Sequence, residues 1–141
     1  MKITVLGSGG WGIALAMSAE RNGHSVTLWS PFDEEILELS TQRESKRLLK
    51  GIKIPEDIKM TTNISISENS DITIIAVPSI AVKETAIRLK EIKNPGIVVN
   101  VAKGLEATSL KRLSEVISDE ITAPVVVLSG PSHAEEVARK V

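Results

Sequence analysis

The chain has 141 residues, an ordinary length for one domain with a core of its own. It contains no Cys, which excludes disulfides and thiolate metal sites, and its net charge of −1 gives no field that would attract nucleic acid or an anionic membrane. With only two Trp and one Phe, a row of aromatic side chains for stacking bases is excluded as well.

The first three expected elements form a βαβ unit. Residues 1–6 are a short β-branched run, which is typical of a buried strand. Residues 10–22 place apolar side chains at helical spacing, and Asn22-Gly23 is a common signal for the end of a helix. Residues 25–29 form a second apolar strand.

The next crossover is expected to begin with a helix and to end in a charged stretch. Ser30 is expected at the N-cap, with Pro31 at the first helical position and Asp33 at the third. Residues 41–51 are the most charged segment, and we interpret them as a solvated helix end and loop rather than as a binding patch. Residues 58–62 then form a short strand.

The rest of the chain continues the alternation of strands and helices. Strands are expected at 71–77, 97–101 and 125–128, and helices at 79–92, 109–118 and 132–141, the last with Glu135 spaced to pair with Arg139. Because the strands are continuous apolar runs, we expect an α/β fold: a Rossmann-type, doubly wound, mostly parallel sheet with helices on both faces. Residues 1–141 make one domain, and since no stop signal follows the last helix, we expect a fragment of a longer protein.

The apolar runs of the sequence bear on where the protein resides. None of these runs approaches the ~18 residues that a membrane span needs. The N-terminus enters a strand pattern directly, without the basic region and cleavage site of a signal peptide. We therefore expect a cytoplasmic protein that binds neither membrane nor nucleic acid.

The clearest chemical signal is the motif Gly7-Ser8-Gly9-Gly10-Trp11-Gly12, a G-x-G-x-x-G between a strand and a helix. Gly7 permits the tight turn, Gly9 lets a pyrophosphate approach the backbone, and Gly12 lets the helix pack close to the strand. The helix N-terminus offers unpaired N–H groups and the positive end of its dipole. We therefore expect a dinucleotide to bind at this turn.

Two further segments reach the carboxyl edge of the expected sheet, where ligands of open α/β sheets bind. Pro78 ends the fourth strand and Ser79 follows it, and helix capping explains this pair as well as cofactor contact does. Lys103 stands between the fifth strand and Gly104, where it could hold an anionic substrate or polarise a carbonyl group. On position alone, an ordinary surface lysine is the stronger interpretation.

The segment 129–134 follows the sixth strand at the same edge. Ser132 is a good N-cap for the last helix, and Glu135 completes a capping box, so that the helix N-terminus would be a second anion site. His133 has no evident Asp or Ser partner and is not expected to act as a general base.

Taken together, these segments resemble the NAD(P)-dependent glycerol-3-phosphate dehydrogenases of the bacterial type. The resembling stretches occur in the family's order and are GSGGWGIALA at 7–16, GHSVTLW at 23–29, AVPS at 76–79, AKGLE at 102–106 and LSGPSHAEEV at 128–137. Many unrelated enzymes share the glycine motif, whereas the pairing of AKGLE with SGPSHAEE is far more specific.

The resemblance implies an activity and a set of binding residues. Members interconvert glycerol 3-phosphate and dihydroxyacetone phosphate by hydride transfer with NAD or NADP, which supplies a phospholipid precursor. The expected cofactor-binding residues are Gly7, Gly9, Gly10, Trp11, Gly12, Ser30, Pro78, Lys103 and Ala134. The expected substrate-binding residues are Lys103, Gly130 and Ser132.

The resemblance also implies parts that this sequence lacks. Members have a second, helical domain, which brings the lysine that accepts the proton and further phosphate ligands, so we expect no catalytic residue and no metal in this chain. The face that would dock this domain is expected to be apolar and exposed, which makes a homo-oligomer one expected state.

The form of the cofactor depends on the end of the second strand. Bacterial relatives often carry a basic residue there, where the 2′-phosphate of NADP would lie, and this chain has Ser30-Pro31-Phe32-Asp33 instead. Asp33 lies near the place of the expected ribose-binding acid. Because residues 25–42 contain no Lys or Arg, we expect a modest preference for NAD, which a cation folding back would reverse. The candidates for such a cation are Arg43, Lys46 and Arg47.

Two alternatives stay open on the sequence. One is the related 6-phosphogluconate- or ketopantoate-type reductase domain, against which the SGPSHA segment argues. The other is a non-catalytic module that senses nicotinamide nucleotides.

Overall fold

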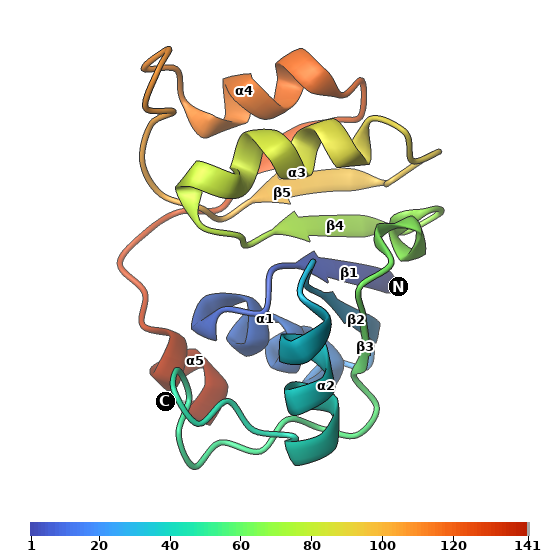
Figure 1. The fold of residues 1–141 in the computed structure, drawn as a ribbon, viewed down its shortest axis with the longest axis vertical. Helices are drawn as coiled ribbons and strands as arrows, with labels where there is room; N and C mark the ends of the chain where they lie inside the picture. The colour runs from blue at the N-terminus through green and yellow to red at the C-terminus, as the bar shows by residue number, and fades with distance from the viewer. Residues whose placement is uncertain (141) are drawn as a thin grey trace.

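Six strands form one parallel sheet in the computed structural model, which describes residues 1–140 (Figure 1). The strands are β1 (Lys2–Leu6), β2 (Ser25–Trp29), β3 (Lys59–Thr61), β4 (Ile72–Ile75), β5 (Ile97–Asn100) and β6 (Val125–Val127). Their order in the sheet is β3-β2-β1-β4-β5-β6, and all pairings are parallel. This order confirms the Rossmann-type, doubly wound fold that the sequence predicts.

The order of the sheet reverses at β1, which pairs with β2 on one side and with β4 on the other. Thr4 of β1 thus lies opposite Thr27 and Thr73 in register. Right-handed crossovers that proceed in opposite directions from a central strand place their helices on opposite faces of the sheet. The point of reversal is where such folds bind ligands, at the carboxyl ends of the strands.

Helices cover both faces of the sheet. They are α1 (Gly10–Arg21), α2 (Asp33–Gln42), α3 (Val82–Leu89), α4 (Leu113–Glu120) and α5 (Ala134–Arg139), with the 3₁₀ turns η1 (Ile64–Ser67) and η2 (Ser79–Ala81). One aliphatic core joins the sheet to α1, α2 and α5, and a second joins it to α3 and α4. Within residues 1–140, no helix is long and apolar enough to cross a membrane.

Neighbouring residues of one strand serve the two cores. Val5 packs against the core with α1, whereas Leu6 packs against the core with α3, and both side chains are fully buried. Burial of an aliphatic side chain of this size stabilises a fold by about 1.5–3 kcal/mol. Because consecutive residues of the apolar strands face opposite sides of the sheet, helices must cover both of its faces.

Three helices begin later than the sequence predicts. Helix α2 begins at Asp33 with Phe32 as its N-cap, α4 begins at Leu113, and α5 begins at Ala134 with His133 as its N-cap. Asp33 is thus the first residue of α2 and not the third. At α4 the cap is a box in which the Glu115 carboxylate accepts a hydrogen bond from the Arg112 backbone N–H at 2.9 Å.

The serines expected to cap α2 and α5 act in the turns before these helices, and so does Ser109 before α4. Ser30 accepts the Phe32 backbone N–H, Ser109 donates both its N–H and its hydroxyl to Glu106, and the Ser132 hydroxyl reaches the carbonyl two residues earlier. The hydrogen bonds from the Ser109 side chain and from the backbone of Ser109 and Thr108 lower the pKa of Glu106 from 4.5 to about 2. Short polar side chains stabilise turns as readily as helix starts, so the type of residue does not decide between the two.

Other boundaries also differ from the expectations. The helix expected at 79–92 is the 3₁₀ turn η2 followed by α3, which ends at Leu89. Helix α5 ends at Arg139, and Lys140 follows in the left-handed conformation that commonly terminates helices. Glu135 and Arg139 do not form the expected ion pair in the part of the chain that the structure describes. Val141, the last residue of the expected helix, lies outside the described residues.

Candidate functional site

The predicted site residues follow strands whose carboxyl ends meet at one edge of the sheet. Gly7 follows β1, Ser30 follows β2, Pro78 follows β4 and Lys103 follows β5. Figure 1 shows the segment after β6 crossing this edge to reach α5, which lies beside α1. Parallel pairing therefore collects residues far apart in the sequence at the turn between β1 and α1.

Two glycines of this turn hold the backbone together. Gly7 has a φ of +121°, and a Cβ on it would lie 2.6 Å from the carbonyl carbon of Ala76. A Cβ on Gly12 would lie 2.0 Å from the carbonyl oxygen of Gly7. Only glycine fits at these two positions, because α1 and the end of β4 pack directly against the turn.

Gly9 differs, because a Cβ on this residue would meet no atom within 4 Å. Its φ of −65° is open to every residue type, so neither packing nor conformation requires glycine here. The space above Gly9 lies at the N-terminus of α1, where backbone N–H groups are unpaired. Because Gly9 has no side chain, a pyrophosphate could approach the backbone beside these N–H groups.

Two pockets flank Gly9. The first, which we name the β2 pocket, has a volume of about 520 Å³. It is lined by Gly7, Ser8, Gly9, Trp29, Ser30, Pro31, Phe32, Glu35, Val77, Pro78, Ile80, Ala81, Glu84, Thr85 and Arg88. The second, the β5 pocket, has a volume of about 290 Å³ and is lined by Gly9, Gly10, Trp11, Ala76, Val77, Pro78, Ser79, Val101, Ala102 and Lys103. An extended ligand that crosses Gly9 would have one end in each pocket.

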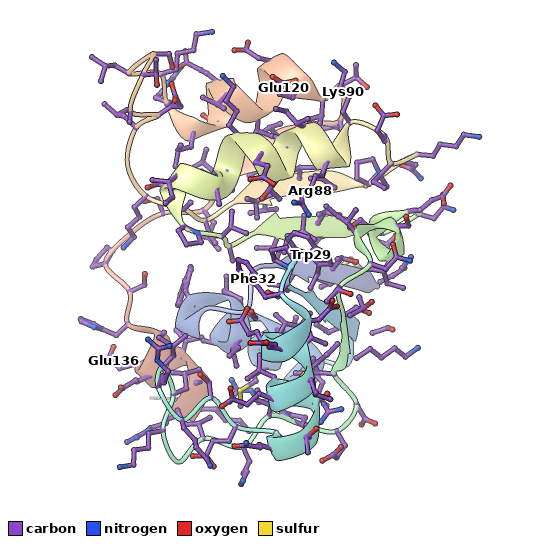
Figure 2. The ribbon with its side chains drawn as sticks, in the orientation of Figure 1. Trp29, Phe32, Arg88, Lys90, Glu120 and Glu136 are labelled. Carbon is purple, nitrogen blue, oxygen red and sulfur yellow. The ribbon has the colours of Figure 1, made fainter. Side chains whose placement is uncertain are left out.

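The β2 pocket has an apolar wall suited to a flat ring. Phe32 and Ile80 line it and are 66% and 89% exposed, respectively. Trp29 forms its floor, fully buried, with its indole N–H bonded to the Thr62 carbonyl at 2.9 Å. The Arg88 guanidinium lies 5.9 Å from the centre of the Trp29 ring (Figure 2) and pairs with Glu84. Of this arrangement, sequence reasoning identifies Ser30 and Pro78 but misses Arg88 and Ile80.

A third pocket of about 480 Å³, the α2 pocket, adjoins the β2 pocket. Its lining residues are Ser8, Phe32, Glu34, Glu35, Glu38, Leu39, Ser45, Lys46, Arg47 and Leu48. The charged segment 41–51 is thus not only solvated, because it forms one wall of this pocket and buries Leu49 in the core. Arg43 faces elsewhere and donates to the carbonyls of Pro55 and Ile58.

Lys103 connects the β5 pocket to the turn after β6. Its ammonium group donates a hydrogen bond to the Gly130 carbonyl at 2.9 Å, and the side chain is exposed. Ser79, beside it in the pocket, makes no capping hydrogen bond, so capping does not explain that residue. Lys103 therefore presents a cation at the mouth of the pocket, where it can contact an anionic ligand.

The remaining predicted residues lie close to the site but outside these pockets. A Cβ on Gly10 would lie 3.7 Å from the Cβ of Ala134, so α5 approaches the N-terminus of α1. Ser132 and Gly130 are exposed in the turn that precedes α5. Helix α5 has only six residues and begins after His133 instead of Ser132, with no side-chain cap, and the second anion site at its start stays a prediction.

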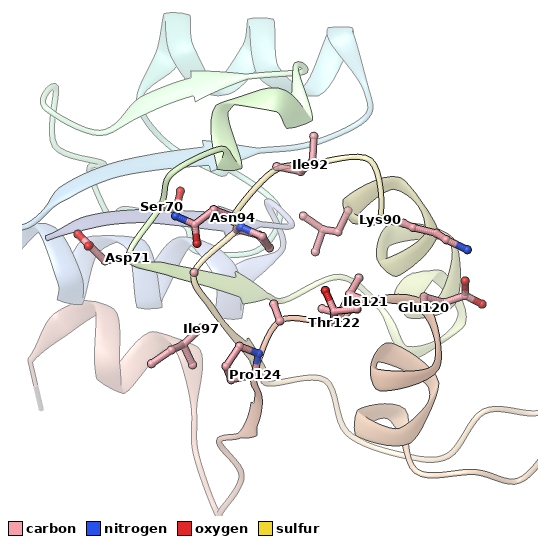
Figure 3. A pocket seen from close by; sticks show the side chains of 14 residues that line it. Ser70, Asp71, Lys90, Ile92, Asn94, Ile97, Glu120, Ile121, Thr122 and Pro124 are labelled. Carbon is pink, nitrogen blue, oxygen red and sulfur yellow. The ribbon is translucent and has the colours of Figure 1, made fainter.

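The largest cavity, about 640 Å³, lies at the opposite edge of the sheet (Figure 3). It is formed by the turns that lead into β4, β5 and β6, among them the turn at Asn94 and Gly96. The one carboxylate at its sheet end, Asp71, already accepts the Lys2 backbone N–H at 2.7 Å. Ligands of open α/β sheets bind at carboxyl ends, so we place the functional site at Gly9.

Comparison with protein families gives a match over residues 2–141, to the family described as the NAD-dependent glycerol-3-phosphate dehydrogenase N-terminus. Two curated relatives, both named glycerol-3-phosphate dehydrogenase [NAD(P)+], are those of Fusobacterium nucleatum and Thermoanaerobacter sp.. They are 49% and 48% identical over 99% and 100% of this chain. The chain spans 43% of the length of each relative.

Solved structures give the same result. The crystal structure of glycerol-3-phosphate dehydrogenase from Coxiella burnetii is 34% identical, with a TM-score of 0.91 over 99% of this chain and 44% of that protein. A ketopantoate reductase from Ralstonia eutropha has a TM-score of 0.71 over 90% of this chain and 40% of that protein, with 16% identity. The second likeness shows the fold alone.

Proposed function

The chain belongs to the NAD-dependent glycerol-3-phosphate dehydrogenase family, matching its N-terminal part, and on that premise we propose that residues 1–141 are the dinucleotide-binding domain of such an enzyme. The whole enzyme would transfer a hydride between NAD(P)H and dihydroxyacetone phosphate, with sn-glycerol 3-phosphate as the reduced product. The relatives are named for this reaction, and the chain covers less than half of their length.

The observation that carries the proposal is the open space at Gly9 between two pockets. Of the four glycines in the motif, Gly7 and Gly12 are required by packing, and a Cβ on Gly10 would make ordinary contacts at 3.6 Å or more. Gly9 is the one of the four whose Cβ would meet no atom within 4 Å. A ligand whose phosphates contact the backbone at residue 9 would explain why this residue is glycine. The β2 pocket would then take the adenine, and the β5 pocket would take the nicotinamide.

The residues of the chain would divide the work between cofactor and substrate. The N–H groups at the start of α1 would hold the pyrophosphate, and Phe32 and Ile80 would flank the adenine ring. When bound, the nicotinamide supplies or accepts the hydride. Lys103 lies at the mouth of the β5 pocket, where its charge would hold the substrate phosphate or polarise the carbonyl that is reduced. The Gly130 carbonyl keeps this ammonium group in place.

The proposal is tested by titrating the chain with NADH. Both tryptophans report on the site, because Trp29 lines the β2 pocket and Trp11 lines the β5 pocket. We expect saturable quenching of their fluorescence in the wild type and its loss in Gly9→Val, whose side chain fills the open space. The matched control is Thr122→Val, which introduces the same side chain at an exposed residue beside the cavity at the opposite edge of the sheet.

Thermal unfolding of both variants shows whether they fold. Thr122→Val should bind NADH as the wild type does. Saturable binding that Gly9→Val leaves unchanged would place the dinucleotide elsewhere, and the proposed function of this site would be wrong.

A further inference from the structure

This inference rests on the proposed function and concerns which dinucleotide the site accepts. In dinucleotide-binding folds an Asp or Glu near the end of the second strand accepts the ribose 2′-hydroxyl, and a nearby Arg accommodates a 2′-phosphate. Here the strand ends at Trp29, Ser30 follows it, and Asp33 lines neither the β2 nor the α2 pocket. The Ser30 hydroxyl instead donates a hydrogen bond to Oε2 of Glu35, on the first turn of α2.

We propose that Glu35 is the residue that makes this site prefer NAD to NADP. The contact with Ser30 supplies, from α2, the carboxylate that the end of β2 lacks. Ser30 is 1% exposed and also accepts the Phe32 backbone N–H at 3.3 Å, so the hydroxyl that holds Glu35 is itself fixed. Glu35 is only half-buried, and its side chain therefore reaches the pocket that it lines.

The position of Glu35 connects two pockets. It lines both the β2 pocket and the α2 pocket, and so do Ser8 and Phe32. The second carboxylate oxygen, Oε1, has no hydrogen-bond partner among residues 1–140. One oxygen is thus held by the protein, and the other can accept a hydrogen bond from a ribose hydroxyl that enters from the β2 pocket.

The charges around Glu35 are unfavourable to the 2′-phosphate of NADP. Glu34 and Glu38 line the same α2 pocket, so three carboxylates belong to this wall. Lys46 and Arg47 line the opposite wall, but both are exposed, and neither forms an ion pair within the described part of the chain. A 2′-phosphate carries a charge of about −1.5 to −2 and would lie next to the carboxylate that the Ser30 hydroxyl holds.

The test compares the affinities of the chain for NADH and NADPH in the wild type and in Glu35→Gln. This substitution keeps an oxygen for the Ser30 hydroxyl and removes the charge. We expect the wild type to prefer NADH, and the variant to reduce that preference by roughly three- to tenfold, as expected for one partly exposed pair of like charges. Glu35→Lys should shift it further in the same direction.

Glu38→Gln is the matched control, because Glu38 lines the α2 pocket from the next turn of the same helix but does not line the β2 pocket. We expect it to change the preference by less than about twofold, and the preference of the wild type to weaken as salt is raised. If both variants changed the preference equally, the preference would come from the summed negative charge of α2 and not from a contact of Glu35.

The outcomes separate the two proposals. Failure of the wild type to bind either nucleotide overturns the proposed function, and this inference with it. Binding of both nucleotides, with a ratio that Glu35→Gln and Glu35→Lys leave unchanged in folded protein, overturns the role of Glu35 alone.

Discussion

Two glycines of one turn serve different purposes in this molecule. Gly12 is required by the protein itself, because the space for its Cβ is already occupied by the Gly7 carbonyl. Gly9 has free space above it, and the proposed cofactor gives that space a use. A requirement for folding and a requirement for binding therefore lie three residues apart, and substitutions can separate them.

We predict that Gly12→Ala destabilises the fold while Gly9→Ala does not. The added methyl group on Gly12 forces α1 away from the end of β1, and overpacking of this kind costs roughly 1–3 kcal/mol or more. On Gly9, the methyl group meets no atom of the protein within 4 Å. Urea denaturation measures both free energies of unfolding. Equal stability of the two variants would contradict this division.

The sequence predicts the strands and α1 well, but it predicts the starts of other helices incorrectly. The strands follow directly from apolar runs, and α1 follows from its glycine start and its Asn22-Gly23 end. Ser30 and Ser132 each have the right type and spacing for an N-cap, yet each bonds within the turn before its helix. Whether such a serine caps the helix or bonds within the turn depends on the path of the chain after it. Tertiary packing sets this path, and the neighbouring residues do not show it.

Helix α5 is held by one side chain from α1. The Arg21 guanidinium donates hydrogen bonds to the carbonyls of Val137 and Ala138, both at 2.9 Å. These carbonyls belong to the last turn of α5, which has few other polar partners. Because α5 also brings Ala134 to the start of α1, Arg21 indirectly supports the edge at which the cofactor site lies.

We predict that Arg21→Met loosens α5 without unfolding the domain. Methionine keeps the apolar stem but removes the donors, and hydrogen bonds to a charged group contribute about 1.5–3 kcal/mol. Amide hydrogen exchange over Ala134–Arg139 should accelerate by roughly tenfold or more, since about 1.4 kcal/mol corresponds to a factor of ten. The amides of α3 are the internal control. Unchanged exchange in α5 would mean that apolar packing alone holds it.

At the scale of the whole molecule, the doubly wound parallel sheet and the edge that carries the site could be predicted from the alternation of strands and helices. The walls of the site could not. Arg88 lies over Trp29, and the loop with Lys46 and Arg47 faces Glu35, because crossovers return distant segments to the same edge. Spacing reveals Glu84 and Arg88 as a pair on one helix, but no short pattern indicates which pocket they line.

We predict that the 141-residue chain binds NADH but reduces dihydroxyacetone phosphate far more slowly than a full-length relative. Lys103 is the one titratable side chain among the residues that line the β5 pocket, and it already donates to Gly130. Proton transfer by a positioned group contributes about 10²–10⁴-fold to such reactions. Oxidation of NADH, followed by absorbance against the Fusobacterium nucleatum enzyme, measures the difference. Rates within about tenfold would show that this chain supplies its own proton donor.

The place of β1 at the centre of the sheet has a consequence for the time course of folding. The turn after β1 is encoded in the first dozen residues, but Leu6 accepts the Ala76 N–H at 2.8 Å, and the tight space at Gly7 is made by Ala76 and Val77. Pairing across so long an interval is slow, because the loop must close before its contacts stabilise it. During synthesis, the glycine turn leaves the ribosome before the residues that pack against it, Ala76 and Val77. We therefore expect the nucleotide site to form only after about half of this chain has been made.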